Sequence, residues 1–230
     1  METDTILIGD ALPDTSLPIL FDGVPMDLPP SATLNHDGSV TVVLDYPKTL
    51  KYRAPGSDIV AREEAFSSLT LRRLTGLDVR KMIGAKNPVE MALSIASGLG
   101  PAKLNLLKTV MDATDETAAN EVVGELLGGM KQGLPDYAED SPEGVTLPLL
   151  RPAVDEEGTV YTSLTFKRLT AAQRKIAADA ASQLDWGIAL ATGVTPKLAK
   201  SLVDRLDGAD AMAVNQVILF LFGSGRRTGR

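Results

Sequence analysis

The chain contains one stretch of sequence twice. The segment "SLTLRRLT" at residues 68–75 returns 95 positions later as "SLTFKRLT" at residues 163–170. The same shift aligns residues 91–128 with residues 186–223 without a gap. Identical pairs recur along this alignment, among them Gly98 with Gly193, Pro101 with Pro196, Leu107 with Leu202, Asp112 with Asp207 and Asp115 with Asp210. A constant spacing over this length indicates a tandem duplication of one structural unit.

The duplication predicts how the chain is divided. Upstream of the first match, residues 40–47 resemble residues 145–152 at a shift of 105, so the first copy has ten extra residues in its loop, the difference between 105 and 95. Units this small approach the lower size limit for an independent core, and we therefore expect them to pack together. The expected segments are an extended N-terminal arm (1–39), repeat 1 (40–129), a polar linker (130–144), repeat 2 (145–223) and a flexible basic tail (224–230).

Each repeat combines strands with helices. Apolar and polar residues alternate in 39–47 and 65–73 of the first copy, and in 144–152 and 160–168 of the second. Alternation of this kind predicts strands, and two neighbouring strands usually pair as a hairpin. We predict an α+β fold made of two tandem homologous units, each a β-hairpin followed by three to four helices. The pattern leaves open whether the two hairpins join in one sheet or each lies on its own helices.

Capping signals place the helices. Thr170 and Gln173 form a capping box, which predicts a helix of about twenty residues that ends near Gly193. The first copy instead has Asn87 followed by Pro88, a cap and a first-turn proline that indicate two shorter helices. The last helix of each copy is expected to begin at Asp115 or Asp210 and to end at Gly128 or Gly223.

Composition excludes several classes of protein. The chain has 30 acidic and 23 basic side chains and a net charge of −7, which argues against duplex nucleic acid as a partner. It has no cysteine, so disulfides and thiolate metal sites are excluded. The sequence lacks a signal-peptide pattern and an apolar run long enough to span a membrane. We expect a cytoplasmic protein that interacts with neither membrane nor nucleic acid.

The residues needed for catalysis are scarce. His36 is the single histidine, and its neighbours Asp37 and Gly38 indicate a turn. The pairs Asp112/Asp115 and Asp207/Asp210 recur in both copies, and such pairs can bind Mg²⁺ through water. Their position between two helices favours capping of free backbone amides instead. We therefore predict a protein that is not an enzyme and has no cofactor or metal.

The order of these motifs resembles the Mu-like phage tail assembly chaperones. The resemblance rests on the "LTLRR" strand end and on a leucine followed, after four residues, by Asp-x-x-Asp before the last helix. In that family one copy is the whole protein, so the duplication, the insertion around residues 51–63 and the N-terminal arm are departures.

The resemblance implies a non-catalytic chaperone. It would bind the helical tape measure protein and keep it soluble in the cytoplasm of the bacterial host during tail tube assembly, and it would be missing from the mature virion. The tail tube protein and a second copy of the chain are further candidate partners. The alternative is a structural tail or baseplate component that is retained in the virion.

Partner binding of this kind needs exposed apolar side chains, and the last helix of each repeat is the candidate. Residues 217–222 are six consecutive apolar residues, more than one buried stripe holds, so some must face a partner or the other repeat. Phe220 and Phe222 lie about 200° apart on a helix, so we expect one to pack in the core and the other to dock. The candidate residues are Val122, Leu126, Leu127, Val217, Ile218, Phe220, Leu221 and Phe222.

Overall fold

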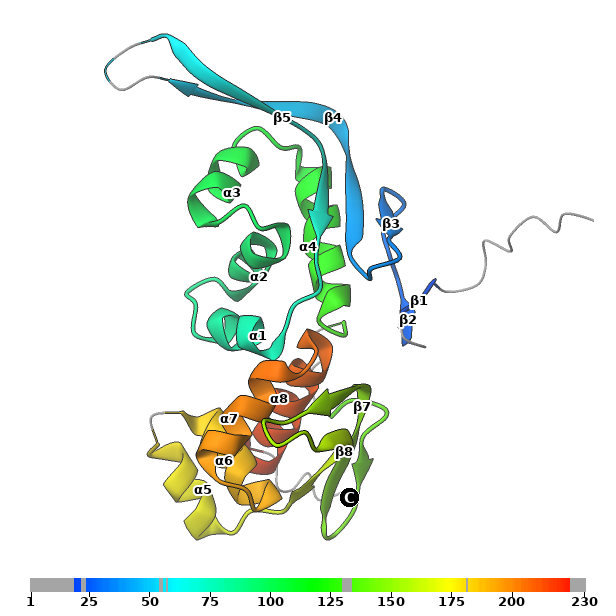
Figure 1. The fold of residues 1–230 in the computed structure, drawn as a ribbon, viewed down its shortest axis with the longest axis vertical. Coiled ribbons are helices and arrows are strands. Elements are labelled where there is room, and N and C mark those ends of the chain that lie inside the picture. The colour runs from blue at the N-terminus through cyan, green and yellow to red at the C-terminus, as the bar shows by residue number, and fades with distance from the viewer. Residues whose placement is uncertain are drawn as a thin grey trace, which may run out of the picture.

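The computed structural model describes residues 19–21, 24–53, 56, 58–129, 134–180 and 182–223. Figure 1 shows two bodies stacked end to end, which we call unit 1 (29–129) and unit 2 (134–223). Each body packs helices against an antiparallel sheet, so the predicted α+β class is confirmed. The predicted basic tail (224–230) lies outside the described residues.

The two units have the same order of elements. Unit 1 consists of β3 (Ala32–Leu34), β4 (Val40–Arg53), β5 (Val60–Leu71), α1 (Gly76–Ile83), α2 (Pro88–Ser97), α3 (Pro101–Lys108) and α4 (Ala113–Leu126). Unit 2 consists of β6 (Glu139–Asp140), β7 (Gly144–Val154), β8 (Val160–Lys167), α5 (Ala171–Ala178), α6 (Gln183–Thr192), α7 (Pro196–Arg205) and α8 (Gly208–Gly223). A short ladder of β1 (Ile19–Phe21) and β2 (Val24–Met26) precedes them. Duplication would produce this shared order, and the common origin of the units stays a prediction.

The sheets settle a question that the sequence left open. Strands β3-β4-β5 form one sheet and β6-β7-β8 form another, and in the described part of the chain the two hairpins do not join. The third strand of each sheet comes from a segment that the sequence assigned to the arm (1–39) or the linker (130–144). Those two boundaries are therefore corrected: unit 1 begins near Pro29 and unit 2 near Leu134, because β3 and β6 pair with the hairpins that follow them.

Both hairpins contain the same large bulge. In β4, residues 44–47 lie opposite the single residue Ser67, and in β7, residues 149–152 lie opposite Thr162. Four residues opposite one cannot continue the ladder, so some backbone N–H groups in the bulge need another partner. The two bulges occupy equivalent positions at the shifts of 105 and 95 residues.

Helix boundaries correct two further predictions. The single helix expected after Thr170 is two helices, because the Ser182 side chain caps a new helix by accepting from the Asp185 N–H. Asn87 caps α2 as predicted. The last helix of each unit begins two residues earlier than expected, at Ala113 and at Gly208.

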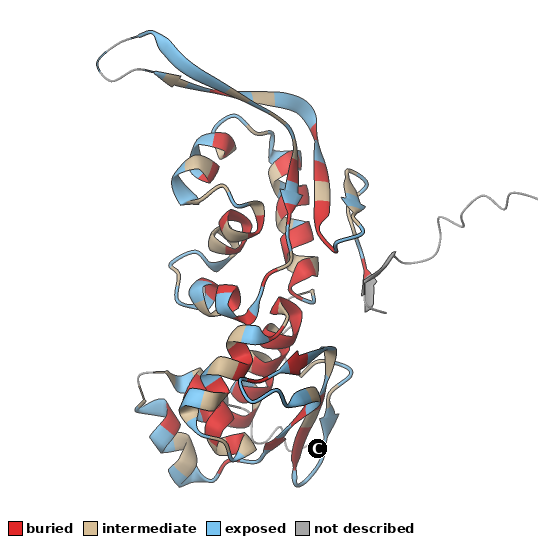
Figure 2. Cartoon of the chain, in the orientation of Figure 1, coloured by how far each residue is buried: buried red, intermediate tan, exposed pale blue. Residues whose placement is uncertain are grey.

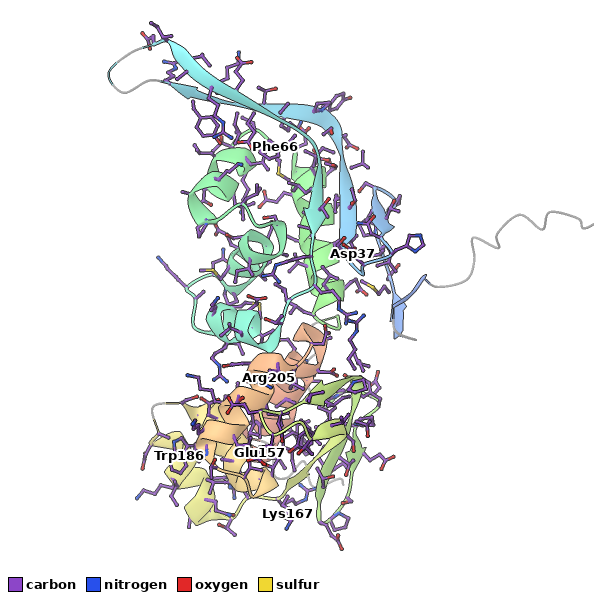
Figure 3. All side chains as sticks on the ribbon, viewed as in Figure 1. Asp37, Phe66, Glu157, Lys167, Trp186 and Arg205 are labelled. Atoms are coloured by element: carbon purple, nitrogen blue, oxygen red, sulfur yellow. The ribbon has the colours of Figure 1, made fainter. Side chains whose placement is uncertain are left out.

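The β4–β5 hairpin projects past the body of unit 1 and is mostly exposed (Figures 1 and 2). Its inner face rests on α3: Leu50 is buried there, and the Lys103 Nζ lies 2.6 Å from Glu64 and 5.3 Å from the centre of the Phe66 ring (Figure 3). The shorter β7–β8 hairpin instead folds against α7, where Arg205 donates to the Val154 carbonyl at 3.3 Å. The longer hairpin of unit 1 therefore forms a projecting arm.

The two units meet through their backbones at the start of α1 and the start of α8. Gly76 N–H donates to the Leu206 carbonyl at 2.9 Å, and Gly208 N–H donates to the Leu74 carbonyl at 2.8 Å. A Cβ at position 76 would lie 1.7 Å from the Val203 carbonyl oxygen, and one at position 208 would lie 2.8 Å from the Leu74 carbonyl oxygen. Only glycine permits this approach at both positions.

Ion pairs surround the backbone contact. The Arg73 Nε donates to Asp207 at 2.8 Å. Arg80 of α1 reaches across to Asp204 at 2.8 Å and to Asp185 at 2.7 Å. All five of these side chains are largely buried, which favours one fixed orientation of the units. We call the backbone contact at Gly76 and Gly208, together with these ion pairs, the joint. It meets the expectation that the two repeats pack together.

Candidate partner-binding surface

Most of the predicted partner-binding residues lie in the core. Val122 and Leu126 of α4 and the C-cap residue Leu127 are buried, and on α8, Val217, Ile218 and Leu221 are buried. They belong to the apolar cluster that also holds the sheet residues of both units. Six of the eight candidates are therefore inaccessible to a partner in this conformation, and the alternative of burial within the chain applies to them.

Phe222 is the core-facing phenylalanine of α8. It is partly buried, and a Cβ built on Gly187 of α6 would lie 2.8 Å from its Cε2 atom. The ring therefore occupies the space that a side chain at position 187 would fill. Phe220 is partly buried as well and packs against the core from another side of the helix.

The most exposed apolar residue of α8 is one that the sequence did not single out. Leu219 is 56% exposed, between the buried Ile218 and the partly buried Phe220. The apolar run 217–222 contained it, but the run alone does not indicate which of its side chains faces outward. We call Leu219 and the adjoining Phe220, which is partly buried, the exposed edge of α8.

The recurring aspartates anchor the bulges. Asp115 Oδ1 accepts from the Asp45 N–H at 2.9 Å, and Asp210 accepts from the N–H groups of Leu150 and Arg151 at 2.8 and 3.1 Å. Asp45 and Leu150 are equivalent positions of the two bulges. The prediction that the second aspartate of each pair caps a helix is therefore wrong, because its carboxylate binds strand amides that the bulge leaves unpaired.

The first aspartate of each pair has a different role in each unit. Asp207 caps α8 as predicted, with Oδ1 accepting from the Ala209 N–H at 3.1 Å, and also pairs with Arg73 across the joint. Asp112 stands at the same place before α4 but makes no side-chain capping bond to the described helix and pairs with Lys48 instead. Each of these two carboxylates pairs with a basic side chain, Asp207 with Arg73 and Asp112 with Lys48.

Asp210 has the most perturbed environment. Burial raises the pKa of its carboxyl to about 6, and the nearby Asp207 adds to this, while the two backbone N–H groups and Arg73 act in the opposite direction. Burial together with the charge of Asp210 raises the pKa of Tyr137 to about 12.

A metal centre finds no support in the described residues. Within them, no group of three or more His, Asp or Glu side chains is arranged to hold a metal ion. His36 lies exposed in the turn before β4, as predicted. Over the same part of the chain, no helix is both long and apolar enough for a membrane span.

A comparison of the chain with protein-family models, curated proteins and solved structures finds no significant match.

Proposed function

We propose that the protein is a non-catalytic phage tail assembly chaperone, which binds the tape measure protein and keeps it soluble while the tail tube assembles. The motifs that carry the resemblance lie at the end of the hairpin and at the start of the last helix of each unit. The observation that supports binding is the exposed edge of α8, where Leu219 is 56% exposed beside Phe220.

The physical argument concerns the surface that a helical partner needs. An amphipathic helix docks its apolar stripe on a few apolar anchors, and shielding that stripe prevents aggregation. The exposed edge of α8 offers such anchors, and the net charge of −7 keeps the complex in solution. The proposal depends most on Leu219, because more than half of this apolar side chain is left uncovered by unit 2 and is accessible to a partner.

Serine substitution at Leu219 tests the proposal. We expect Leu219→Ser to fold normally and to lose co-purification with a co-expressed tape measure protein, because an exposed leucine contributes little to stability but much to a docked surface. Leu106→Ser is the matched control, since Leu106 is 49% exposed on α3 of the other unit. Undiminished binding of a folded Leu219→Ser variant, together with undiminished binding of Phe220→Ser, would remove α8 from the proposal.

The two phenylalanines are expected to separate stability from binding. Phe222→Ser should mainly lower the melting temperature, because the ring fills the space over Gly187. Phe220→Ser should mainly weaken binding. Trp186 is the single tryptophan and precedes Gly187, so its fluorescence is a reporter for events at this end of α8 (Figure 3).

The alternative, a structural tail or baseplate component, differs in its fate. A chaperone acts in the cytoplasm of the host and leaves before the particle is complete, whereas a structural component remains. Mass spectrometry of purified particles distinguishes them: the chaperone is expected to be missing at any stoichiometric level. Detection at a fixed copy number per tail would establish the alternative.

A further inference from the structure

An open groove lies on unit 1, away from the exposed edge of α8. It has a volume of about 430 Å³ and lies between the turn at Pro29–Ser31 and the first half of α4. Its lining residues are Pro29, Pro30, Ser31, Ala113, Thr114, Thr117, Ala118 and Glu121. Two prolines and two alanines give it apolar walls, and small side chains leave it unfilled.

Unit 2 has the same turn in the same place. The Ala32 N–H donates to the Pro29 carbonyl at 2.8 Å, and the Ala138 N–H donates to the Pro135 carbonyl at 2.9 Å. Both turns lead directly into the third strand of their sheet. Counting from these turns, the residue of unit 2 that corresponds to Ser31 is Tyr137.

Unit 2 has larger residues at two of the equivalent positions. Tyr137 corresponds to Ser31 and, at the shift of 95 residues, Met212 corresponds to Thr117. Ser31 and Thr117 both line the groove of unit 1. An aromatic side chain is therefore accommodated in unit 2 at the turn position where unit 1 has only a serine hydroxymethyl group.

The groove of unit 1 has an acidic rim. Glu121 lines it directly, and Asp45 accepts from the Thr114 hydroxyl at 3.3 Å beside it. Glu125 lies one turn farther along α4, where it accepts from the Asp27 N–H at 3.1 Å. The nearby cations are already paired, Lys48 with Asp112 and Lys108 with Glu116. Among the described residues the carboxylate of Glu121 at the rim is unpaired, so it favours a partner that carries positive charge.

We propose that this groove is a docking site for an aromatic side chain carried by a basic segment of a partner protein. Unit 2 carries a tyrosine of its own at the equivalent turn position, whereas the groove of unit 1, which has Ser31 there, is open to an external aromatic ring. The apolar walls bind the ring, and the carboxylates of the rim attract flanking Lys or Arg side chains.

The chain supplies its own blocking variant. Ser31→Tyr places in unit 1 the residue that unit 2 has at the equivalent turn position, and Ser163→Tyr is the matched control, because Ser163 is exposed on β8 of the other unit. The probe is a 12-residue peptide with one central tyrosine flanked by lysines, added to the full-length ¹⁵N-labelled protein. We expect chemical shift changes at Thr114, Thr117 and Ala118 that diminish at high salt.

The expected pattern is specific. Ser31→Tyr should lower the affinity for the peptide by at least about tenfold, and Ser163→Tyr should leave that affinity unchanged. A peptide with serine in place of tyrosine should not bind. If Ser31→Tyr does not fold, Thr117→Met narrows the same groove with the residue of unit 2. Shift changes elsewhere only, or equal changes in the folded blocking variant, would overturn the proposal. A shift pattern confined to the Leu219 edge would overturn it and leave the chaperone proposal standing.

Discussion

The two units place the same residue in the same position and use it differently. Asp115 anchors its bulge with one oxygen, and among the described residues its buried Oδ2 has no hydrogen-bond partner. Asp210 is fully buried and uses both oxygens, one for each of two consecutive strand amides. The difference follows from the strands rather than from the aspartates: β4 continues into the projecting arm, whereas β7 turns back towards α7. Aspartates at equivalent positions therefore both anchor a bulge, but they accept different numbers of backbone hydrogen bonds.

The joint gives a second contrast between the units. Gly76 and Gly208 each donate a backbone hydrogen bond across the joint, and the equivalent residues at the free ends of the molecule are Ala171 and Ala113. Arg80 is likewise replaced by Lys175. Each unit thus has the features of the joint only on the side that faces the other unit, so the contact is built for one pair and not for a growing chain of copies.

The largest expected effect comes from breaking this joint. Gly76→Ala should lower the free energy of unfolding by about 4 kcal/mol, because the new Cβ would lie 1.7 Å from the Val203 carbonyl oxygen and would separate the two backbone hydrogen bonds. Urea unfolding measures this change. Gly84→Ala is the control, since its Cβ has no atom closer than 3.8 Å and its φ is −79°. Equal stability of the two variants would show that the joint tolerates a side chain.

The second prediction concerns pH. The pKa of the folded Asp210 is about 6, against 3.8 for an ordinary carboxyl, so the folded state binds the proton more tightly than the unfolded state. The resulting contribution to the free energy of unfolding is at most about 3 kcal/mol. It is fully present below about pH 4 and is lost as the pH rises through about 6. Urea unfolding of Asp210→Asn at several pH values should show no such fall in the free energy of unfolding between pH 4 and pH 7.

A matched variant isolates that effect. Asp115→Asn changes the equivalent anchor and should retain the fall in stability between pH 4 and pH 7. Carboxyls with lowered pKa, such as Asp155, lose their contribution only as the pH falls further, and so they do not cancel it in this window. An identical pH profile for wild type and Asp210→Asn would mean that Asp210 does not control it.

The third prediction tests the anchors directly. At pH 5, where the cost of a buried charge is small, Asp210→Ala should destabilise by about 2 to 3 kcal/mol and Asp115→Ala by about 1 to 2 kcal/mol, because they leave two and one strand amides unpaired. Hydrogen exchange should accelerate at Leu150 and Arg151 in the first variant and at Asp45 in the second. Larger destabilisation by Asp115→Ala would reverse the ranking of the two anchors.

Local signals in the sequence predicted much of this fold. The Thr170–Gln173 capping box and the Asn87 cap lie where the sequence placed them, since a cap depends only on a few neighbouring residues. The alternating strands were also found, because alternation reflects which face of a sheet is buried. The break before Ser182 was missed, because no proline or glycine marks it.

Features that depend on distant partners were not predictable from the sequence. A bulge is set by the register of two strands, so the role of Asp115 and Asp210 appears only when the strands are paired. Gly76 and Gly208 read as ordinary helix starts until the opposing carbonyls are in place. The exposed edge of α8 was missed for a related reason: a continuous apolar run has no polar face to show that Leu219 points outward.

The smallest effect contrasts two glycines inside helices. Gly124 of α4 occupies the position equivalent to Leu219, and a Cβ there meets no described atom within 4 Å. Since glycine in a helix interior costs up to about 1 kcal/mol relative to alanine, Gly124→Ala should stabilise the protein by about 0.5 to 1 kcal/mol and raise its melting temperature by about 2 °C. Gly187→Ala makes the same change in α6 but places a Cβ 2.8 Å from the Phe222 ring, so it should lower the melting temperature. Thermal unfolding should show a higher melting temperature for Gly124→Ala and a lower one for Gly187→Ala if packing, and not helix propensity, decides the outcome at position 187. Stabilisation by both would indicate that Phe222 moves aside at little cost, and would remove it from the core of unit 2.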